Sequence, residues 1–533
     1  VIPAKLYGRD NEVVKLITAF KSVCKGSLEL TLVTGYSGVG KTSLVQELYR
    51  PVASAGGHYI CGKYDQYQRN IPYSALATAF SQYFDQMLAE PKEKLNDIKQ
   101  SILKAVGASG QVLIEVVPLL ENIIGPQPAV PPVDPQAAKN RFNQIFINFM
   151  ATICQPSSPL IIFLDDLQWM DQASLTLFKL LLTNGDIKGL HLVGAYRDNE
   201  VDASHPLHLL LDDLVSTGRS FGTIHLTNLT KKNVSQLICQ TLSLSGSECR
   251  ELVNIVFEKT MGNAFFTKEF FKGLYAESLI TEQNGRWLWD RGQIIQRNLT
   301  DNVVDYMAMK IAKYSNETKN AISMAACIGN EFDLETLRLI TRTEASCTTL
   351  QHLDKALRDG ILAPVNEAYK QVGIVDTDGV IIKFRFQHDR IQQAAYSLIP
   401  IDTLEQVHYR IGTILYDSSK NTPTFEEKLF EIVSHLNSGI SCVDTAGLKL
   451  DIADLNYQAG IKALSSAAYQ SATQYFHTAS ELLPKDAFTS NYNLALKIHM
   501  ELARSLYING EFEESEKQYP LLLTNVKNTI DEV

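Results

Sequence analysis

The sequence lacks several features that would place it in a specialised class of protein. No apolar run approaches the ~20 residues that a membrane-spanning helix needs. The eight cysteines contain no CxxC pair, so neither a zinc site nor a disulfide framework is indicated. The net charge of -10 argues against nucleic acid as a partner. These absences fit a protein of the reducing cytoplasm without a membrane span.

The length and the composition predict a globular protein of several domains. A chain of 533 residues is too long for one hydrophobic core and indicates roughly three or four domains. Hydrophobic residues make up 45% of the chain and charged residues 20%, which is ordinary for a globular protein. A helical pattern runs almost to the last residues, "NTIDEV", and we expect the chain to be a segment of a longer protein.

The most specific motif is a phosphate-binding loop. The stretch "ELTLVTGYSGVGKTSLVQEL" contains a β-rich apolar run, a glycine turn and a helical pattern from Lys41, and it matches G-x-x-x-x-G-K-[ST]. Backbone N–H groups in such a loop surround phosphate oxygens, and the helix N-terminus adds a positive dipole. We expect ATP or ADP here, with Lys41 at the β- and γ-phosphates and Thr42 on Mg²⁺. The expected nucleotide contacts come from Gly35, Ser37, Gly38, Val39, Gly40, Lys41, Thr42 and Ser43.

Two acids end a second apolar run, "PLIIFLDDLQWMD". P-loop enzymes hold Mg²⁺ partly through an acid at the end of such a strand, and Asp165 occupies that position. We expect Asp166 to polarise the attacking water; the alternative is that it only caps the following turn. A further strand, "LHLVGAYRDNE", leads to Arg197, which is placed to sense the γ-phosphate or else forms a surface ion pair. The predicted catalytic residues are thus Lys41, Asp166 and Arg197.

Five stretches together resemble a known family. "LYGRDNE", "GYSGVGKTSL", "GKYDQYQRNIPYSAL", "FLDDLQWMD" and "GAYRDNE" are similar to the AAA-type ATPase module of STAND signal-transduction proteins, in particular the version inside large hybrid kinases. Those kinases carry a serine/threonine kinase before the module and GAF and histidine-kinase domains after it. The resemblance implies an α/β P-loop NTPase core over residues 1–229, a parallel sheet with helices on both faces. It also implies that Gly8 and Arg9 lie beside the adenine and ribose.

The resemblance and the helical patterns divide the rest of the chain into three domains. Residues 230–314 are expected to form a helical domain, in which "GNA" (Gly262 to Ala264) replaces the family's G-x-P. A contact between Ala264 and adenine is therefore left open, and Gly262 can instead be a plain helix C-cap. Residues 315–400 read as two helices, a strand pair and a helix, as in a winged helix. Residues 401–533 show small residues and aromatics at helix-pair spacing, which predicts TPR-like repeats that bind a protein partner.

One histidine at the end of the predicted winged helix has three open interpretations. In related STAND proteins a histidine at this place contacts the β-phosphate of ADP, and "FQHD" places His388 similarly. A histidine followed by an acid is also typical of a kinase phosphoacceptor, although "RIQQAA" follows here instead of the usual Leu-Arg-Thr-Pro. The third interpretation is a buried core histidine.

The expected function is an ATP-binding, slowly hydrolysing signal-transduction switch that regulates a larger sensor kinase. ADP would hold the module closed, and ATP would open it for assembly with itself or for signal relay. Two alternatives remain: an ATP-dependent STAND transcription regulator and a nucleotide-binding scaffold without turnover. Kinase activity within this chain is not expected, because neither H-R-D-x-x-x-x-N nor D-F-G occurs in it.

Overall fold

A parallel β-sheet forms the centre of the N-terminal half. The computed structural model describes residues 2–527 except 4, 132, 297–302, 367–368 and 371–380. The sheet has five strands in the order β2-β3-β4-β1-β5, and every neighbouring pair is parallel. The strands are β1 (Leu28–Thr34), β2 (His58–Lys63), β3 (Leu160–Asp165), β4 (Leu190–Tyr196) and β5 (Gly222–His225).

Both faces of this sheet are covered by helices. All six residues of β3 are buried, as is usual for a central parallel strand. Because successive side chains point to opposite faces, Ile161 and Phe163 pack in one apolar cluster and Ile162 and Leu164 in another. The helices of the first cluster include α1 (Asp10–Val23), α2 (Lys41–Val45) and α3 (Tyr49–Ser54); those of the second include α4 (Ser74–Leu88), α8 (Pro135–Ile153) and α9 (Gln172–Thr183). The predicted α/β core is confirmed.

The part from 230 to 314 is largely helical but includes a β-hairpin that the sequence reading missed. The hairpin turns at Asn284 and Gly285, both with positive φ, which is the typical Asn-Gly hairpin turn. The Asn-Gly pair in "QNGR" was the sequence signal for this hairpin. The elements are α11 (Lys231–Leu242), α12 (Arg250–Thr260), α13 (Ala264–Ala276), β6 (Ile280–Gln283), β7 (Arg286–Trp289), α14 (Arg291–Gln296) and α15 (Val303–Ala312).

The part from 315 to 400 combines helices with a small antiparallel sheet of order β8-β10-β9. Three helices precede the strand pair instead of the two expected, because the short strand β8 interrupts the first of them. The strand pair and the following helix were expected. This arrangement supports the winged-helix prediction. The elements are α16 (Asn316–Ile328), β8 (Glu331–Asp333), α17 (Leu334–Thr341), α18 (Ser346–Arg358), β9 (Leu362–Pro364), β10 (Lys383–Phe386) and α19 (Asp389–Tyr396).

The C-terminal part consists of helices that pack in successive pairs: α20 with α21, α22 with α23, and α25 with α26. Gly460 shows why small residues recur, because a Cβ there would lie 2.4 Å from the Phe476 ring of the neighbouring helix. The helices are α20 (Ile401–Ser419), α21 (Phe425–Ser438), α22 (Ala446–Ser465), α23 (Tyr469–Leu482), α24 (Ala487–Ser490), α25 (Tyr492–Ile508) and α26 (Phe512–Asn525).

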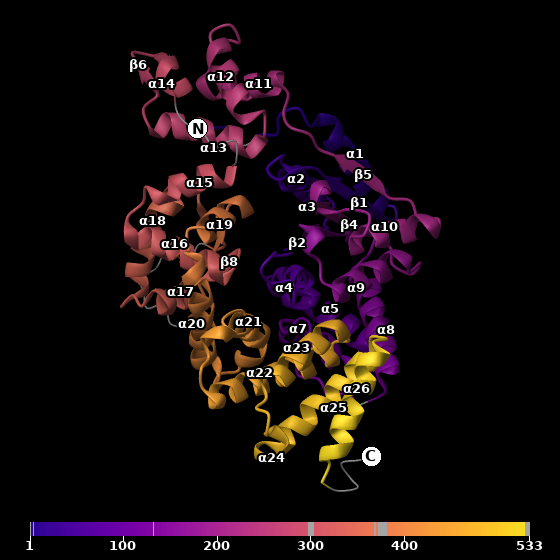
Figure 1. Ribbon diagram of the computed structural model, residues 1–533. Coiled ribbons are helices and arrows are strands. Elements are labelled where there is room, and N and C mark those ends of the chain that lie inside the picture. The colour runs from indigo at the N-terminus through magenta and orange to yellow at the C-terminus, as the bar shows by residue number, and fades with distance from the viewer. Residues whose placement is uncertain are drawn as a thin grey trace.

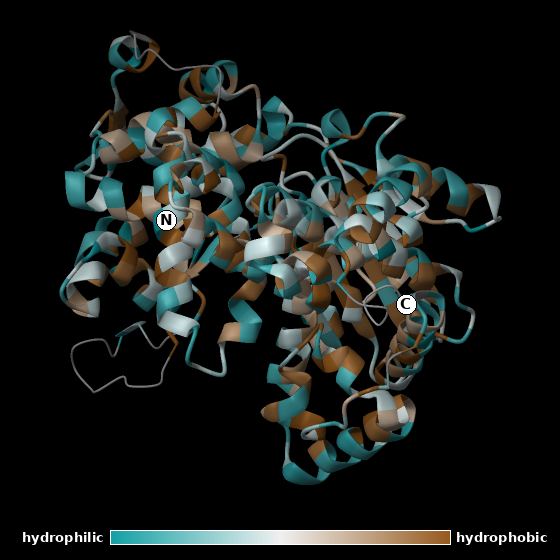
Figure 2. Ribbon diagram, turned by 60° about the horizontal axis from the view of Figure 1, so that its bottom comes forward, coloured by the Kyte–Doolittle hydropathy of each residue, from teal (hydrophilic) through white to brown (hydrophobic). Residues whose placement is uncertain are grey.

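The chain curls so that its C-terminal helices return to the N-terminal part, which holds the parallel sheet (Figure 1). The Tyr73 hydroxyl donates to the Ser466 carbonyl at 2.8 Å, and the Tyr475 hydroxyl donates to the Asn70 carbonyl at 3.1 Å. Figure 2 shows hydrophobic and hydrophilic residues alternating along most helices, as expected where one side of each helix packs inward. No helix among the described residues is long and apolar enough to cross a bilayer.

Candidate nucleotide site

A cavity of about 480 Å³ lies at the carboxyl ends of the sheet strands. Its walls come mainly from three parts of the chain: the phosphate loop and strand ends of the N-terminal part, the first turns of α13, and residues 385–389 before and at the start of α19. Ligands of open α/β sheets bind in a crevice at this edge. The cavity therefore lies where the sequence motifs predict a nucleotide, and parts far apart in the sequence enclose it.

The phosphate loop has the backbone that its glycines predict. Gly35, Gly38 and Gly40 all have φ between +81° and +137°, which only glycine adopts readily. Lys41 is buried and donates through Nζ to the carbonyl oxygens of Gly35 at 2.8 Å and Tyr36 at 3.1 Å. Burial lowers the pKa of Lys41, although Asp165 and Asp166 act in the opposite direction. The lysine thus lies over the loop that it is expected to serve.

Thr42 and Asp165 meet as expected for a Mg²⁺ site. The Thr42 hydroxyl donates to Asp165 Oδ2 at 2.7 Å. Burial and then Asp166 raise the pKa of Asp165, which Lys63 partly offsets. A hydroxyl and a carboxylate are oxygen donors that Mg²⁺ accepts, with its other ligands supplied by phosphate and water. No three acidic, histidine or cysteine side chains in the described ranges form a metal cluster. The donor set therefore fits Mg²⁺ bound together with a nucleotide.

Asp166 follows β3 with φ +55° and directs its carboxylate into the cavity wall. Its Oδ1 accepts a hydrogen bond from Gln168 Nε2 at 2.9 Å and lies 3.4 Å from Arg197 Nε. Its Oδ2 lies 3.4 Å from Lys63 Nζ. The side chain makes no capping hydrogen bond to the following turn, which speaks against the purely structural alternative.

Arg197 is buried, so the surface ion pair considered for it is wrong. Its Nη1 lies 2.7 Å from Glu200 Oε1, its Nη2 pairs with Asp389 Oδ2, and its guanidinium lies 4.6 Å from the centre of the Trp169 ring. Burial acts to lower the pKa of Arg197, but Asp389 and the other nearby carboxylates outweigh it and raise the pKa. Arg197 therefore joins the end of β4 in the N-terminal part to the start of α19.

His388 lies in the cavity wall, with 21% of its side chain exposed. Its ring stacks on Phe265 of α13 at 4.1 Å between centroids. Its Nδ1 accepts from the Arg390 N–H at 3.1 Å and lies 2.5 Å from Asp389 Oδ1. These contacts place the ring at the boundary of two parts, which speaks against a core histidine. The β-phosphate and phosphoacceptor interpretations remain predictions.

Gly8 and Arg9 do not line this cavity. Arg9 is buried, and its Nη2 donates to the carbonyl of Val39 at 3.3 Å and to that of Thr227. Arg9 thus ties the phosphate loop to the segment after β5. Gly8 lies so close to the Asn233 side chain that a Cβ would be 2.0 Å from Nδ2. The adenine and ribose contacts inferred for Gly8 and Arg9 remain predictions.

The "GNA" segment docks directly on the phosphate loop. Asn263 Nδ2 donates to the Ser37 carbonyl at 2.9 Å, and the Phe265 N–H donates to the Gly38 carbonyl at 2.9 Å. Asn263 Oδ1 also accepts from the Phe266 N–H and so caps α13. Ala264 lines the cavity. Asn263 was not predicted as a site residue. The sequence signal available for it was its position as an N-cap before a helical run rich in aromatic residues.

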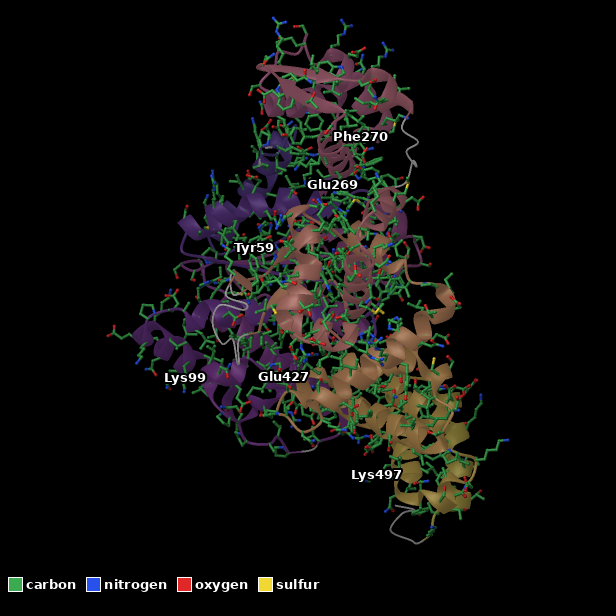
Figure 3. The ribbon with its side chains drawn as sticks, turned by 90° about the vertical axis from the view of Figure 1, so that its left-hand side faces the viewer. Tyr59, Lys99, Glu269, Phe270, Glu427 and Lys497 are labelled. Atoms are coloured by element: carbon green, nitrogen blue, oxygen red, sulfur yellow. The ribbon has the colours of Figure 1, made fainter. Side chains whose placement is uncertain are left out.

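Several further charged residues of the cavity were also missed. Lys63 at the end of β2 lies 3.4 Å from Asp166, and Asp389 at the start of α19 pairs with Arg197. Glu269 of α13, labelled in Figure 3, is buried and pairs with Lys272 at 2.7 Å and Lys310 at 3.1 Å. Lys63 and Asp389 lie within the stretches "GKYDQYQRNIPYSAL" and "FQHD", but no contact was predicted for them, because these residues come together only through the fold.

Comparison with known proteins finds one family to which the N-terminal part is similar. Residues 5–193 match the family model of the AAA ATPase domain. This stretch contains the phosphate loop and both acids, and over this range the chain is similar to AAA ATPase domains.

The chain is also similar to one curated protein over nearly its whole length. This relative is hybrid signal transduction histidine kinase G of Dictyostelium discoideum, with 28% identity over 638 aligned residues. The alignment covers 99% of this chain but 18% of the relative, so the chain spans less than a fifth of that protein. The family match and this relative confirm the resemblance expected from the motifs.

Solved structures with a similar chain path include two from archaea. A STAND protein with a tetratricopeptide repeat sensor from Pyrococcus horikoshii matches with a TM-score of 0.45 and 12% identity over 96% of this chain and 63% of that one. The ORC1 protein of Aeropyrum pernix, solved in complex with DNA, matches with a TM-score of 0.34 and 13% identity over 75% of this chain and 95% of that one.

Proposed function

We propose that this chain is a STAND-type switch that binds ATP, hydrolyses it slowly and regulates a larger sensor kinase. The observation that carries this proposal is the enclosure of the nucleotide site. The AAA ATPase domain supplies the phosphate loop, while α13 and the start of α19 complete the cavity wall. A nucleotide in this cavity therefore contacts parts that need not move together, which is what a switch requires.

The residues of the ATPase part take the roles that their geometry supports. The loop from Ser37 to Ser43 holds the phosphates, and Thr42 with Asp165 holds Mg²⁺, which would neutralise charge on the phosphates. Asp166 orients the attacking water, and Arg197 contacts the γ-phosphate. Supporting observations are the 2.7 Å contact between Thr42 and Asp165 and the place of both Asp166 and Arg197 in the cavity wall.

The closed arrangement is assigned to the ADP state. Asp389 pairs with Arg197 in it, so a γ-phosphate that recruits Arg197 competes with α19 for the same guanidinium. Inverting a population from 1:99 to 99:1 takes about 5.5 kcal/mol of differential affinity. Two or three charge-assisted contacts at ~1.5 to 3 kcal/mol each supply this amount. Lys41, Mg²⁺ and Arg197 are the groups that can make them.

The regulatory role follows from the kinase relative and the division of the chain. We propose a helical domain at 230–314, a winged helix at 315–400 and a TPR-like array from 401. The array binds a protein partner, and the open state associates with other copies or with further domains of the parent protein. The 28% identity to a histidine kinase supports a kinase parent, although the chain covers 18% of that relative.

The experiment that tests the proposal measures nucleotide on the full chain. The copurifying nucleotide is identified after denaturation, and hydrolysis of Mg²⁺-ATP is followed for the wild type and Lys41→Ala. A copurifying ADP and a slow turnover that Lys41→Ala abolishes are expected. Binding without turnover would favour the scaffold alternative. The ion pairs that Lys63 and Arg197 form with Asp166 also support that alternative. Failure to bind any nucleotide would refute both.

A further inference from the structure

Two cysteines lie close together at the junction of helices α11 and α12. Cys239 is in the last turn of α11, and Cys249 is the N-cap residue of α12. The chain turns between them at Ser243, which has a φ of +56° and ends α11. All eight cysteines of the chain are free thiols, so both of these are available for chemistry.

One backbone oxygen, that of Ser245, contacts both cysteines. It accepts a hydrogen bond from the Cys239 thiol, with 3.7 Å between Sγ and the oxygen, and another from the Cys249 N–H at 3.2 Å. The Leu244 N–H donates to the Cys239 carbonyl at 3.0 Å, which fixes the start of the turn. This geometry brings the two residues near the Cα separation of about 4.4 to 6.8 Å that a disulfide requires.

The two thiols differ in exposure, and the difference gives them separate roles. Cys249 is buried, and burial, followed by the neighbouring Cys239 thiol, raises its pKa to about 12. Cys239 is partly exposed, and its thiol contacts a turn whose residues Ser245 to Glu248 are exposed. Because access and thiolate character govern the reactivity of a cysteine, an oxidant in solution should react with Cys239 first.

We propose that Cys239 and Cys249 form a redox modification site, at which hydrogen peroxide produces a disulfide that ties α11 to α12. The Cys239 sulfur attacks one peroxide oxygen, the O–O bond breaks, and one water leaves with the thiol proton, so that Cys239 becomes a sulfenic acid. The Cys249 sulfur then attacks the Cys239 sulfur, the S–O bond breaks, and a second water leaves with the Cys249 proton. The two thiols together lose two electrons, and the peroxide gains them.

The position of this helix pair gives the disulfide something to constrain. Asn233 near the start of α11 lies against Gly8, where a Cβ would be 2.0 Å from its Nδ2. Beyond α12 comes Asn263, whose Nδ2 donates to the Ser37 carbonyl of the phosphate loop at 2.9 Å. In a reducing compartment such a bond is transient and senses oxidants rather than supporting the fold. The inference does not depend on nucleotide turnover.

The test uses the full chain, hydrogen peroxide and peptide mass spectrometry. The reduced protein is treated with peroxide, the remaining thiols are alkylated under denaturing conditions, and the protein is cleaved with trypsin. Both cysteines fall in one tryptic peptide, residues 233–250, because trypsin cuts after Lys232 and Arg250. A disulfide leaves this peptide two hydrogens lighter and without alkyl groups, and dithiothreitol added before alkylation restores both groups.

We expect peroxide to remove both alkyl groups from the 233–250 peptide together, and dithiothreitol to reverse the loss. The exposed Cys347 in α18 reports on the dose, because any exposed thiol should be oxidised by the same peroxide. A 233–250 peptide that keeps both alkyl groups while Cys347 is oxidised would overturn the proposal. Loss of one alkyl group without the other would overturn it as well.

Single variants test the order of attack. Cys249→Ser removes the second thiol and should leave a sulfenic acid on Cys239, which dimedone labels. Cys239→Ser should leave Cys249 unlabelled, because that thiol is buried. Cys347→Ser is the matched control and should form the disulfide as the wild type does. Dimedone on Cys249 in Cys239→Ser, or none on Cys239 in Cys249→Ser, would overturn the assigned roles.

Hydrogen exchange tests whether the bond constrains the helix pair. Amides of α11 and α12 are compared in the reduced and the peroxide-treated wild type, with peroxide-treated Cys239→Ser as the control. A cross-link between neighbouring helices opposes their local opening, so exchange should slow by roughly tenfold in the oxidised wild type and not in the control. Unchanged exchange in a protein whose disulfide is verified would overturn the claim that the bond ties α11 to α12. None of these outcomes bears on ATP hydrolysis, so the proposed function is tested separately.

Discussion

Asp389→Asn tests the contact that holds the start of α19 against the nucleotide site. Asp389 pairs with Arg197, a buried residue of the ATPase part, and its own pKa is held well below the usual value because His388, Lys63 and Arg197 outweigh burial. The substitution removes one negative charge from this cluster and keeps the shape of the side chain. Asp389 is also the first residue of α19, so the pairing acts directly on the position of that helix.

The size of the effect follows from the number of charges that remain. Breaking a buried ion pair by removing one partner typically costs about 3 to 5 kcal/mol. Arg197 keeps Glu200 and Asp166 as partners, so the loss should be nearer the ~1.5 to 3 kcal/mol of one charge-assisted contact. Each 1.4 kcal/mol is a factor of ten. The equilibrium constant for closing the module should therefore fall by roughly ten- to a hundredfold.

The assay is the dissociation rate of a fluorescent ADP from the full chain, followed during a chase with unlabelled ADP. Asp389→Asn should accelerate release by roughly ten- to a hundredfold. Glu200→Gln is the matched control, because Glu200 pairs with the same arginine from within the ATPase part. It should alter release much less. Equal acceleration by both variants, or none by Asp389→Asn, would refute the reasoning that α19 retains ADP through Arg197.

Four further predictions follow from the same geometry. Lys41→Ala should abolish tight nucleotide binding, because the phosphate loop loses its cation; unchanged ATP affinity by calorimetry would refute the assignment. Asp165→Asn should weaken Mg²⁺-dependent binding, whereas Asp166→Asn should leave ATP bound but block hydrolysis, and full turnover by Asp166→Asn would make that acid structural. His388→Ala should speed ADP release by roughly ten- to a hundredfold, and an unchanged rate rules out a phosphate contact. Burial and then the neighbouring histidine lower the pKa of His435 to about 3 in the folded protein. As the pH falls, the unfolded chain therefore takes up a proton on this histidine first, near pH 6.5. The contribution of His435 to the free energy of unfolding should therefore be fully present above that pH and fall by up to about 1.4 kcal/mol per pH unit below it. Denaturant titrations at several pH values should show that the stability of His435→Asn depends less steeply on pH than that of the wild type.

Sequence reasoning was most successful where a motif combines a fixed spacing with a strand before it. The phosphate loop, the pair Thr42 and Asp165, and the strand leading to Arg197 all lie where their patterns predict. Each of these depends on local geometry, because a loop or a strand end directs the side chain. The order of the five parallel strands is harder to predict from the sequence. The strand β2 is a short run that mixes polar and apolar residues, and it was not predicted.

The parts of the site that escaped prediction depend on contacts between distant segments. Lys63 reaches Asp166 only because β2 pairs with β3, and Asp389 reaches Arg197 across 192 positions of sequence. The same holds for Arg9, whose contacts are carbonyls of the loop and of Thr227. A single sequence carries no signal for such pairings. Arg197 follows the strand that predicts it and lies in the cavity wall, but its burial could not be read from a strand end in isolation.

Hydrogen exchange of the full chain in its two nucleotide states tests the central claim most directly. Amides of α19, Asp389–Tyr396, are compared in the ADP-bound wild type and in Asp166→Asn held with Mg²⁺-ATP, which is expected to bind without turnover. The switch predicts slow exchange in α19 and at Phe265, whose N–H donates to the Gly38 carbonyl, with ADP, and faster exchange at both with ATP. Identical exchange in the two states, with binding of each nucleotide verified, would contradict it.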